Sequence, residues 1–324
     1  MPAERKRVVA VTGATGFIGR RLIPQLVAAG WQPRLLLRRD PADTLWGELR
    51  LEVVQGDLGD RASLDRLLDG ADAVLHLAGL IKAPSAQAYL VANRDGTRRL
   101  AEALVQHSAT APMLLVSSLA ARHPELSDYA ASKRAGEEVA RELLGQRLTV
   151  LRPPAVYGPG DRETLIFFQL VSSGVVPMLG DPRSRMAVIH VEDLCRALIG
   201  LLDQAPTGGV HAVADARPQG YDWNEILSAA AQAQGIAIRR RLQVPRWLLR
   251  TVALVGDAGR RIGRSNMLNS EKLNEILHLD WSVTEAELPP LPGWSASFDL
   301  TAGFADAVRY YRTVGWLNSI HKVT

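Results

Sequence analysis

The chain has 324 residues, of which 47% are hydrophobic and 22% are charged, and its formal net charge is +4. This balance is ordinary for a soluble globular protein, and the length suffices for about two structural units. The positive charge lies in scattered pairs such as Arg98–Arg99 and forms no basic block, which argues against a nucleic acid partner. The single cysteine, Cys195, excludes an internal disulfide, and no apolar run reaches the roughly 18 residues of a membrane-spanning helix.

The first half of the chain alternates short apolar runs with helical patterns. Strands are predicted at residues 7–12, 34–37, 52–55, 73–77, 113–117 and 148–151. Helices are predicted at residues 17–29, 63–68, 89–107 and 128–144. This alternation is typical of βαβ units, so we expect an α/β protein with a doubly wound parallel sheet.

The pattern changes after Tyr157, where prolines and glycine turns become frequent and the apolar runs become short. A helix at 191–202 and a strand at 211–213 are expected to return to the main sheet. We therefore predict a first domain made of residues 1–158 with 186–214. A smaller C-terminal unit is predicted at residues 159–185 with 215–324.

The string TGATGFIG, residues 12–19, follows the first predicted strand and opens the first predicted helix. Gly13 permits a tight turn, Gly16 permits close approach of a pyrophosphate, and Gly19 permits close packing of helix on strand. The helix N-terminus adds free N–H groups and the positive end of its dipole. The pattern predicts a dinucleotide site whose other contacts in this turn are Thr15, Phe17 and Ile18.

Tyr129 and Lys133 stand four residues apart, so both side chains lie on one face of the predicted helix. A phenol with a pKa of about 10 is a weak acid–base group at neutral pH. A nearby ammonium stabilises the phenolate and lowers that pKa. Such a pair can move a proton to or from the oxygen on a carbon that exchanges hydride. The spacing alone is common in ordinary helices. The catalytic interpretation is supported by the position of this helix directly after the fifth predicted strand.

These motifs, with RPPAVYGPGD at 152–161, resemble the extended branch of the short-chain dehydrogenase/reductase superfamily over nearly the whole chain. That branch is the NAD-dependent epimerase/dehydratase family, and the resemblance is to its reductases of the dihydroflavonol and 3β-hydroxysteroid type. It implies a Rossmann-type first domain, a substrate-binding second unit, and an enzyme that transfers hydride between a nicotinamide cofactor and a carbonyl or alcohol. It also implies catalytic roles for Ser118, Tyr129 and Lys133, with Ser118 polarising the substrate oxygen.

The resemblance implies further cofactor contacts after the third and fourth strands and on later elements. Asp57 and Leu58 match an adenine-contacting turn, and Asn93 matches a family asparagine. The other implied contacts are Leu77, Ala78, Gly79, Tyr129, Lys133, Pro153 and Val156. For Asn93, a role in packing or helix capping is an equal alternative.

The second strand ends in Arg38 and Arg39, where an acidic residue would bind the ribose hydroxyls of NAD. A guanidinium at this place can bind a 2′-phosphate, which favours NADP(H) as the cofactor. The alternative is NAD, with Asp40 accepting the ribose. No metal site is expected.

Four features of the sequence bear on the substrate. Sugar-nucleotide enzymes of this branch often carry an asparagine at the place of Ala155 and an arginine at the place of Met186, although Arg185 is adjacent. Leu119 and Ala120 replace the acidic pair of dehydratases. With Arg38 and Arg39, these residues favour a reductase or dehydrogenase of a less polar small molecule. The alternatives are a nucleotide-sugar epimerase with tightly bound NAD and a non-catalytic NAD(P)-binding regulatory or assembly subunit.

Three further expectations concern location and partners. The N-terminal segment lacks the apolar core of a signal peptide, which predicts a cytoplasmic protein without an integral membrane segment. The resemblance implies a homodimer through the helices around Ala101 and Ala135. The apolar segment from Val244, with its flanking arginines, is predicted to pack as a helix of the second unit; the alternative is a surface helix that touches a membrane.

Overall fold

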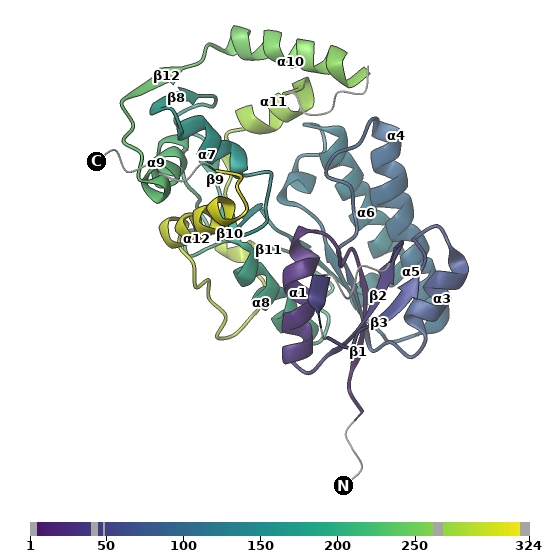
Figure 1. Ribbon diagram of the computed structural model, residues 1–324. Helices are drawn as coiled ribbons and strands as arrows, with labels where there is room; N and C mark the ends of the chain where they lie inside the picture. Colours follow the sequence, from purple (N-terminus) through teal and green to yellow (C-terminus); the bar gives the residue numbers. More distant parts are fainter. Residues whose placement is uncertain (1–4, 40–44, 48, 262–267, 318–324) are drawn as a thin grey trace. The chain divides into compact units, whose positions relative to one another are not determined.

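The computed structural model describes residues 5–39, 45–47, 49–261 and 268–317 (Figure 1). The chain forms two compact units. The first consists of Met1–Arg152, Cys195–His211 and Pro289–Pro292, and the second of Pro153–Leu194, Ala212–Leu288 and Gly293–Thr324. No helix among the described residues has the length and apolar character that crossing a bilayer requires.

The first unit is built on a seven-stranded sheet with the order β11-β6-β5-β4-β1-β2-β3 (Figure 1). The strands are β1 (Val8–Thr12), β2 (Gln32–Leu37), β3 (Glu52–Gln55), β4 (Ala73–His76), β5 (Met113–Val116), β6 (Leu148–Arg152) and β11 (Val210–Ala212). β1 pairs in parallel with β2 on one side and with β4 on the other. The chain order reverses between them, and the carboxyl ends of strands at such a reversal are where α/β proteins bind ligands. The predicted α/β, doubly wound fold is confirmed.

Helices cover this sheet because its strands are apolar on both faces. Every residue of β4 and β5 is buried, as expected for parallel strands between two helical layers. The helices of this unit are α1 (Phe17–Ala28), α3 (Arg61–Leu68), α4 (Ala86–Tyr89), α5 (Gly96–His107) and α6 (Asp128–Leu144), joined by most of α8 (Val191–Leu202). Two short 3-10 turns, η2 (Leu119–Arg122) and η3 (Gly145–Arg147), flank α6. Leucines of α3 and α5, including Leu64, Leu67 and Leu100, pack with Leu115 and Val150 in one core.

One predicted helix differs in form. The pattern at 89–107 predicts a regular helix, whereas the structure has a π-helical segment, η1 (Leu90–Asp95), between α4 and α5. Here α6 approaches closely, since a Cβ on Gly136 would lie only 2.5 Å from the carbonyl oxygen of Asn93. Widened turns of this kind are often found at functional sites.

The second unit has a helical and aromatic core. Its helices are α7 (Leu165–Val171), α9 (Trp223–Gln234), α10 (Arg246–Arg261), α11 (Ser270–Leu277) and α12 (Leu300–Thr313), with the 3-10 turn η4 (Glu285–Glu287). Three strand pairs accompany them: β7 (Ala155–Tyr157) with β10 (Val188–His190), β8 (Val175–Met178) with β12 (Arg240–Gln243), and β9 (Arg185–Met186) with β13 (Asp280–Trp281). Tyr157, Phe168, Phe304 and Tyr311 pack edge-to-face or tilted at the centre. A capping box of Asp222 and Glu225 begins α9.

Candidate active site

The glycine-rich turn joins β1 to α1. Gly13 has φ of +77°, and a Cβ there would lie 2.5 Å from the backbone nitrogen of Ala78. Gly16 is the N-cap of α1 and is exposed, and no side chain caps this helix or places an acid in its first turn. The first N–H groups of α1, on Phe17, Ile18 and Gly19, are therefore available to an anion.

The turn after β4 lies against this glycine turn within the same unit. The backbone nitrogen of Leu77 donates to the carbonyl of Thr12 at 3.1 Å, and that of Ala78 donates to Oγ1 of Thr12 at 3.3 Å. Gly79 follows and is exposed. Two glycine-containing turns beside an uncapped helix N-terminus fit the pyrophosphate of a dinucleotide, because glycine lets the backbone approach it closely.

A buried histidine connects these turns to the helices behind them. Nδ1 of His76 lies 2.6 Å from Oγ1 of Thr12, and its Nε2 lies 2.9 Å from Oγ1 of Thr97. Burial, with a smaller effect from the charge of Lys133, lowers the pKa of His76 to about 3. The ring is therefore neutral at physiological pH and holds β1, β4 and α5 together.

Asn93 fixes the start of the loop that follows β4. Its Oδ1 accepts from the backbone nitrogen of Leu80 at 2.8 Å, and its Nδ2 donates to the Leu80 carbonyl at 3.0 Å. Nδ2 also donates to Oγ of Ser132 at 2.9 Å. A Cβ on Gly79 would approach Oδ1 of Asn93 to 2.9 Å. The asparagine side chain thus shapes the Gly79 turn through hydrogen bonds within the protein.

Helix α6 carries Tyr129 in its first turn and Lys133 one turn later. Nζ of Lys133 donates to the carbonyl of Val116, the last residue of β5, at 2.8 Å. Burial lowers the pKa of Lys133 to about 8, and the nearby Glu137 carboxylate opposes this shift. The ring of Tyr129 is half-buried, with its centroid 6.0 Å from that of Tyr89.

Ser118 follows the end of β5 and begins the η2 turn. Its Oγ accepts from the backbone nitrogen of Ala120 at 3.2 Å, and the residue is half-buried. Because Lys133 is bound to the same end of β5, the structure brings Ser118 and the helix bearing Tyr129 and Lys133 to one place in the first unit. This edge of the sheet also holds the two glycine-containing turns.

A buried carboxylate, that of Glu137, fixes the end of β5 next to Ser118. This residue was not predicted from the sequence. Oε1 of Glu137 accepts hydrogen bonds from Oγ of Ser117 and, at 2.9 Å, from Nε of Arg152. Nη2 of Arg152 donates to Oε2. The two-pronged pair holds the residue directly before Ser118 and lies one helical turn from Lys133. From the sequence, Glu137 is an ordinary i,i+4 neighbour of Lys133, and no spacing signal links it to Ser117 or Arg152.

The remaining cofactor candidates of the first unit lie near strand ends. Arg38 and Arg39 directly follow β2 and are exposed, whereas Asp40 lies outside the described residues. Asp57 is exposed after β3, and its Oδ1 accepts from the backbone nitrogen of Gly59 at 2.7 Å. Leu58 packs against the core of α3 and α5. The carbonyl of Thr15 in the glycine turn accepts from Nε of Arg20 at 2.7 Å.

Pro153 and Val156 belong to the second unit. Val156 lies on β7 and pairs with Ile189 of β10. His190, at the end of β10, is fully buried with its ring stacked on Phe298 at 3.9 Å. These contacts anchor the segment within its own unit.

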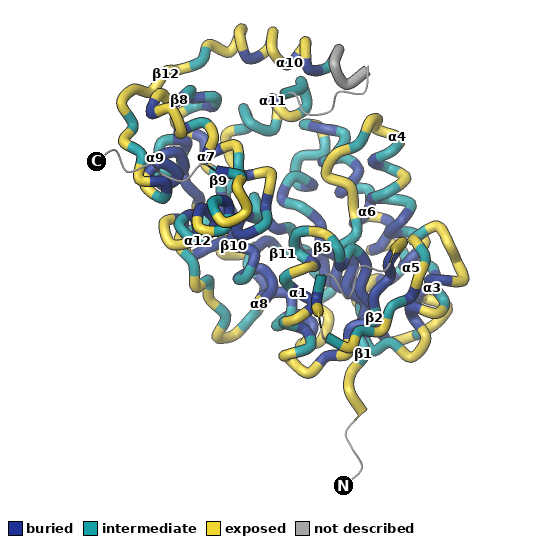
Figure 2. Tube along the Cα trace, viewed as in Figure 1, coloured by how far each residue is buried: buried dark blue, intermediate teal, exposed yellow. Residues whose placement is uncertain are grey.

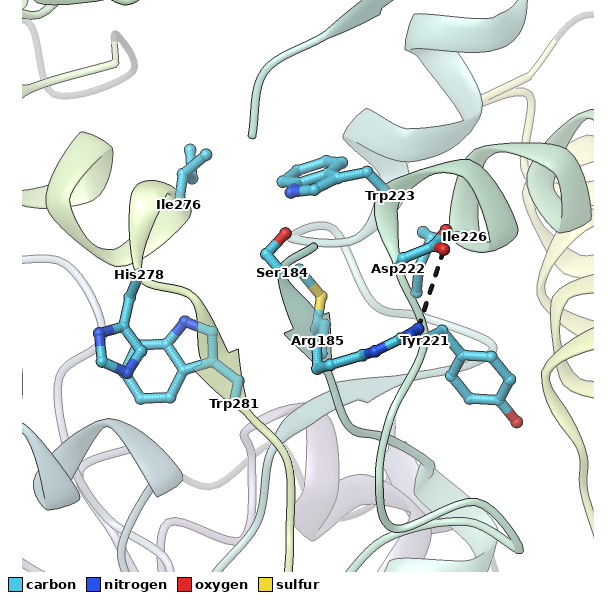
Figure 3. A pocket seen from close by; sticks show the side chains of 10 residues that line it. Ser184, Arg185, Tyr221, Asp222, Trp223, Ile226, Ile276, His278 and Trp281 are labelled. Carbon is cyan, nitrogen blue, oxygen red and sulfur yellow. Dashed lines mark ion pairs between the residues drawn. The ribbon is translucent and has the colours of Figure 1, made fainter. Parts of the chain in front are cut away.

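A small pocket of about 240 Å³ opens in the second unit (Figure 3). Its lining is mostly aromatic and aliphatic, and consists of Ser184, Arg185, Met186, Tyr221, Asp222, Trp223, Ile226, Ile276, His278 and Trp281. Nη1 of Arg185 lies 3.8 Å from Asp222, the pair dashed in Figure 3, and 3.4 Å from Glu225.

The fold and this site define a nucleotide-binding α/β protein, and comparisons with known proteins agree. A family model for the NAD dependent epimerase/dehydratase family matches residues 9–214. The ceramide reductase of Caulobacter vibrioides is 44% identical over 319 residues, covering 98% of each chain. A dTDP-4-dehydro-6-deoxy-D-allose reductase of a Streptomyces species is 26% identical and covers 96% of this chain and 99% of its own.

Among solved structures, the crystal structure of gox2253 superposes with a TM-score of 0.75 at 22% identity. It covers 97% of this chain and 100% of that one, and at this identity the likeness shows the fold alone. The chain belongs to the NAD-dependent epimerase/dehydratase family. It is an NAD(P)-dependent oxidoreductase, and the relatives named above are reductases.

Proposed function

We propose that this enzyme reduces a ketone carried by a ceramide-type lipid, with NADPH as the hydride donor. The observation that carries the proposal is the 44% identity to a ceramide reductase along almost the whole of both chains. The amide of a ceramide skeleton is too unreactive to accept hydride from a nicotinamide, so the reducible group is a ketone on the long-chain base. A substrate of this class presents long apolar chains beside a small polar centre.

The surface beside the proposed proton donor suits such a substrate. Leu80 and Ile81 directly follow the Gly79 turn, and both side chains are exposed. The hydroxyl of Tyr89, whose ring faces Tyr129, donates to the carbonyl of Ile81 at 3.2 Å. An exposed apolar pair linked to Tyr129 through Tyr89 favours an apolar substrate over a sugar nucleotide.

The electrostatics of Arg185 also disfavour a sugar nucleotide. Arg185 is the neighbour of Met186 that could substitute for the arginine often found in sugar-nucleotide enzymes of this branch. Its guanidinium lies near the carboxylates of Asp222 and Glu225, and Glu225 also pairs with Arg217 at 2.6 Å. Carboxylates beside the guanidinium offset its charge and would repel a pyrophosphate.

In the proposed reaction, a bound dinucleotide supplies the hydride. Tyr129 donates its phenolic proton to the ketone oxygen as the alcohol forms, and Ser118 donates a hydrogen bond to the same oxygen. The Lys133 ammonium stabilises the phenolate that remains. Glu137 is a positioning residue, since its carboxylate accepts the hydrogen bond of Ser117, which directly precedes Ser118.

The domain boundaries and cofactor contacts predicted from the sequence remain proposals. We assign residues 1–158 with 186–214 to cofactor binding and residues 159–185 with 215–324 to substrate binding. Pro153 and Val156 are proposed to border the nicotinamide. Asn93 is proposed to act through the shape of the Gly79 turn.

The experiment that tests the function compares two ketones with the purified protein and NADPH. We expect turnover of a long-chain keto-ceramide, followed by loss of nicotinamide absorbance and by mass spectrometry of the alcohol. We expect negligible turnover of a dTDP-4-keto sugar. The reverse preference, or stoichiometric NAD released from the freshly denatured protein, would favour a sugar-nucleotide enzyme.

Replacing Arg38 and Arg39 together with alanine is expected to weaken NADPH binding roughly 10- to 100-fold, because charge-assisted bonds to the 2′-phosphate are lost. NADH binding should change little, since NADH lacks that phosphate. The measurement is the Kd of each nucleotide by fluorescence titration. The control removes two exposed arginines elsewhere, Arg240 and Arg241. An equal loss for both nucleotides would contradict the preference for NADP(H).

Ketone reduction is expected to slow as the pH rises through about 8. Burial brings the pKa of Lys133 down to about 8, so its ammonium is present below that pH and is lost above it. The phenolate left by proton transfer is then no longer stabilised. The profile of kcat against pH at saturating NADPH measures this effect. In Lys133→Arg the cation persists, so any residual activity should show no fall near pH 8; an unchanged fall in that variant would assign it to another group.

Two further proposals, on oligomeric state and cellular location, come from the family resemblance and the sequence. We propose a homodimer through the outer faces of α5 and α6. Ala101 is fully buried within its own chain, so exposed neighbours such as Val105 would make the contact. A cytoplasmic location is the second proposal.

A further inference from the structure

Among the residues whose burial the structure describes, helix α10 packs within the second unit by one face. Leu249 and Ala253 are buried and form a small core with Leu273 of α11. Leu179 and Leu277 pack at its edge. Asp257 faces inward as well, since its carboxylate accepts hydrogen bonds from the backbone nitrogen and Oγ of Ser270 at 3.0 and 2.6 Å.

The opposite face of α10 is apolar and exposed. Trp247, Leu254 and Val255 are 68%, 64% and 56% exposed, and Leu248 and Val252 are also exposed. At 3.6 residues per turn, these five side chains cover an arc on the side of the helix away from Leu249 and Ala253. Figure 2 shows the exposed stretches along α10. We call this set of five residues the α10 apolar face.

Arginines lie on α10 and in the segment just before it. Arg246 and Arg250 lie on α10 itself. Just before it come Arg239, Arg240 and Arg241. All five residues are exposed. Within the described part of the chain, only Arg246 among these five has a carboxylate at ion-pair distance, that of Asp181 at 3.6 Å. The segment that carries the α10 apolar face is therefore strongly cationic.

We propose that α10 docks on an anionic lipid bilayer. Its apolar face would lie at the boundary between headgroups and acyl chains, and its arginines would contact lipid phosphates. An interfacial helix with tryptophan and leucine on one side and arginines on the other has this behaviour. Clustered arginines near such a helix add affinity for anionic lipid. The inference rests on the surface of the second unit and not on the proposed substrate.

Charge complementarity selects a bilayer over a second copy of this chain. A two-fold contact brings the same patch of both subunits together. It would therefore set these arginines against their own copies at short range, which is unfavourable. A bilayer containing acidic lipid instead offers phosphates to the arginines and an apolar interior to the tryptophan and leucines.

Co-sedimentation of the full chain with vesicles tests the proposal. The wild-type protein should bind vesicles of phosphatidylcholine with phosphatidylglycerol, and bind pure phosphatidylcholine more weakly. Added salt should weaken the binding to anionic vesicles, because it screens the arginines. The double variant Trp247→Ser, Leu254→Ser should bind on the order of tenfold more weakly. The matched control Ile166→Ser, Val314→Ser removes two exposed apolar side chains elsewhere and should bind normally.

A second variant keeps the test decisive if the serine variant folds poorly, as judged by its thermal unfolding. Arg240→Gln, Arg241→Gln should lower binding to anionic vesicles roughly 10- to 30-fold and leave the weak binding to neutral vesicles unchanged. Absence of wild-type binding to anionic vesicles would overturn the proposal. So would a self-association in light scattering that the serine variant abolishes while vesicle binding persists, because a second copy would then cover the face. These readouts need no substrate, so they are independent of the proposed reaction.

Discussion

Replacing Tyr129 with phenylalanine is expected to lower kcat roughly 100- to 10,000-fold, the range typical for loss of a positioned acid–base group. The ring remains, so its packing near Tyr89 should persist. Lys133 keeps its hydrogen bond to the Val116 carbonyl, and the backbone turns that fit the dinucleotide are untouched. The expected signature is therefore a large fall in kcat with an NADPH Kd within about twofold of the wild type.

The matched control for this variant is Tyr89→Phe. It removes a hydroxyl of the same kind, which donates to the carbonyl of Ile81 at the edge of the site. We expect its kcat to stay within about an order of magnitude of the wild type, since one neutral hydrogen bond is lost. Comparable turnover of Tyr129→Phe and Tyr89→Phe would refute Tyr129 as the proton donor. Stopped-flow measurement of a single turnover separates the chemical step from product release.

Replacing Glu137 with leucine is expected to destabilise the protein by about 3–5 kcal/mol, because the Arg152 guanidinium loses its two-pronged partner in a largely buried place. Urea unfolding measures this loss. The adjacent Glu138 gives a matched control. It is exposed and pairs with Arg134 four residues earlier, so Glu138→Leu should cost less than about 1 kcal/mol.

A double variant distinguishes the ion pair from simple packing. Glu137→Leu, Arg152→Met removes both charges and fills similar volume, so much of the lost stability should return. Equal destabilisation by the single and double variants would mean that the cost comes from packing around α6 rather than from the unpaired guanidinium. If the double variant regains stability but its kcat stays well below that of the wild type, the result would support the assignment of Glu137 as a positioning residue.

The parts of this site that could be predicted are those determined by residues close together in the sequence. The glycine turn has a fixed spacing between a strand and a helix, and the strands β3 and β4 lie at or within one residue of their expected ends. The pair of Tyr129 and Lys133 needs only the periodicity of one helix. In each case the residues that determine the geometry are neighbours along the chain.

The contacts that could not be predicted join residues far apart. Ser117, Glu137 and Arg152 meet because β5 pairs with β6 and α6 packs beside them, and no short pattern encodes that register. The π-helical segment around Asn93 depends on the close approach of Gly136, so an apolar repeat could predict a helix there but not its widened turn. Which face of α10 is covered depends on α11, and the exposed arc follows only from that packing.

The interleaved composition of the two units has a consequence for the order in which the protein can be made. The strand that covers the edge of β6 is β11, which is synthesised only after Pro153–Leu194 and the rest of α8. A nascent chain that ends at Arg152 would therefore present the open edge of β6, where unpaired backbone groups invite association with other chains. Pro289–Pro292 joins the first unit later still. Final consolidation of both units must then wait until most of the chain has left the ribosome, and a gene cut between them would yield two fragments that each lack essential pieces.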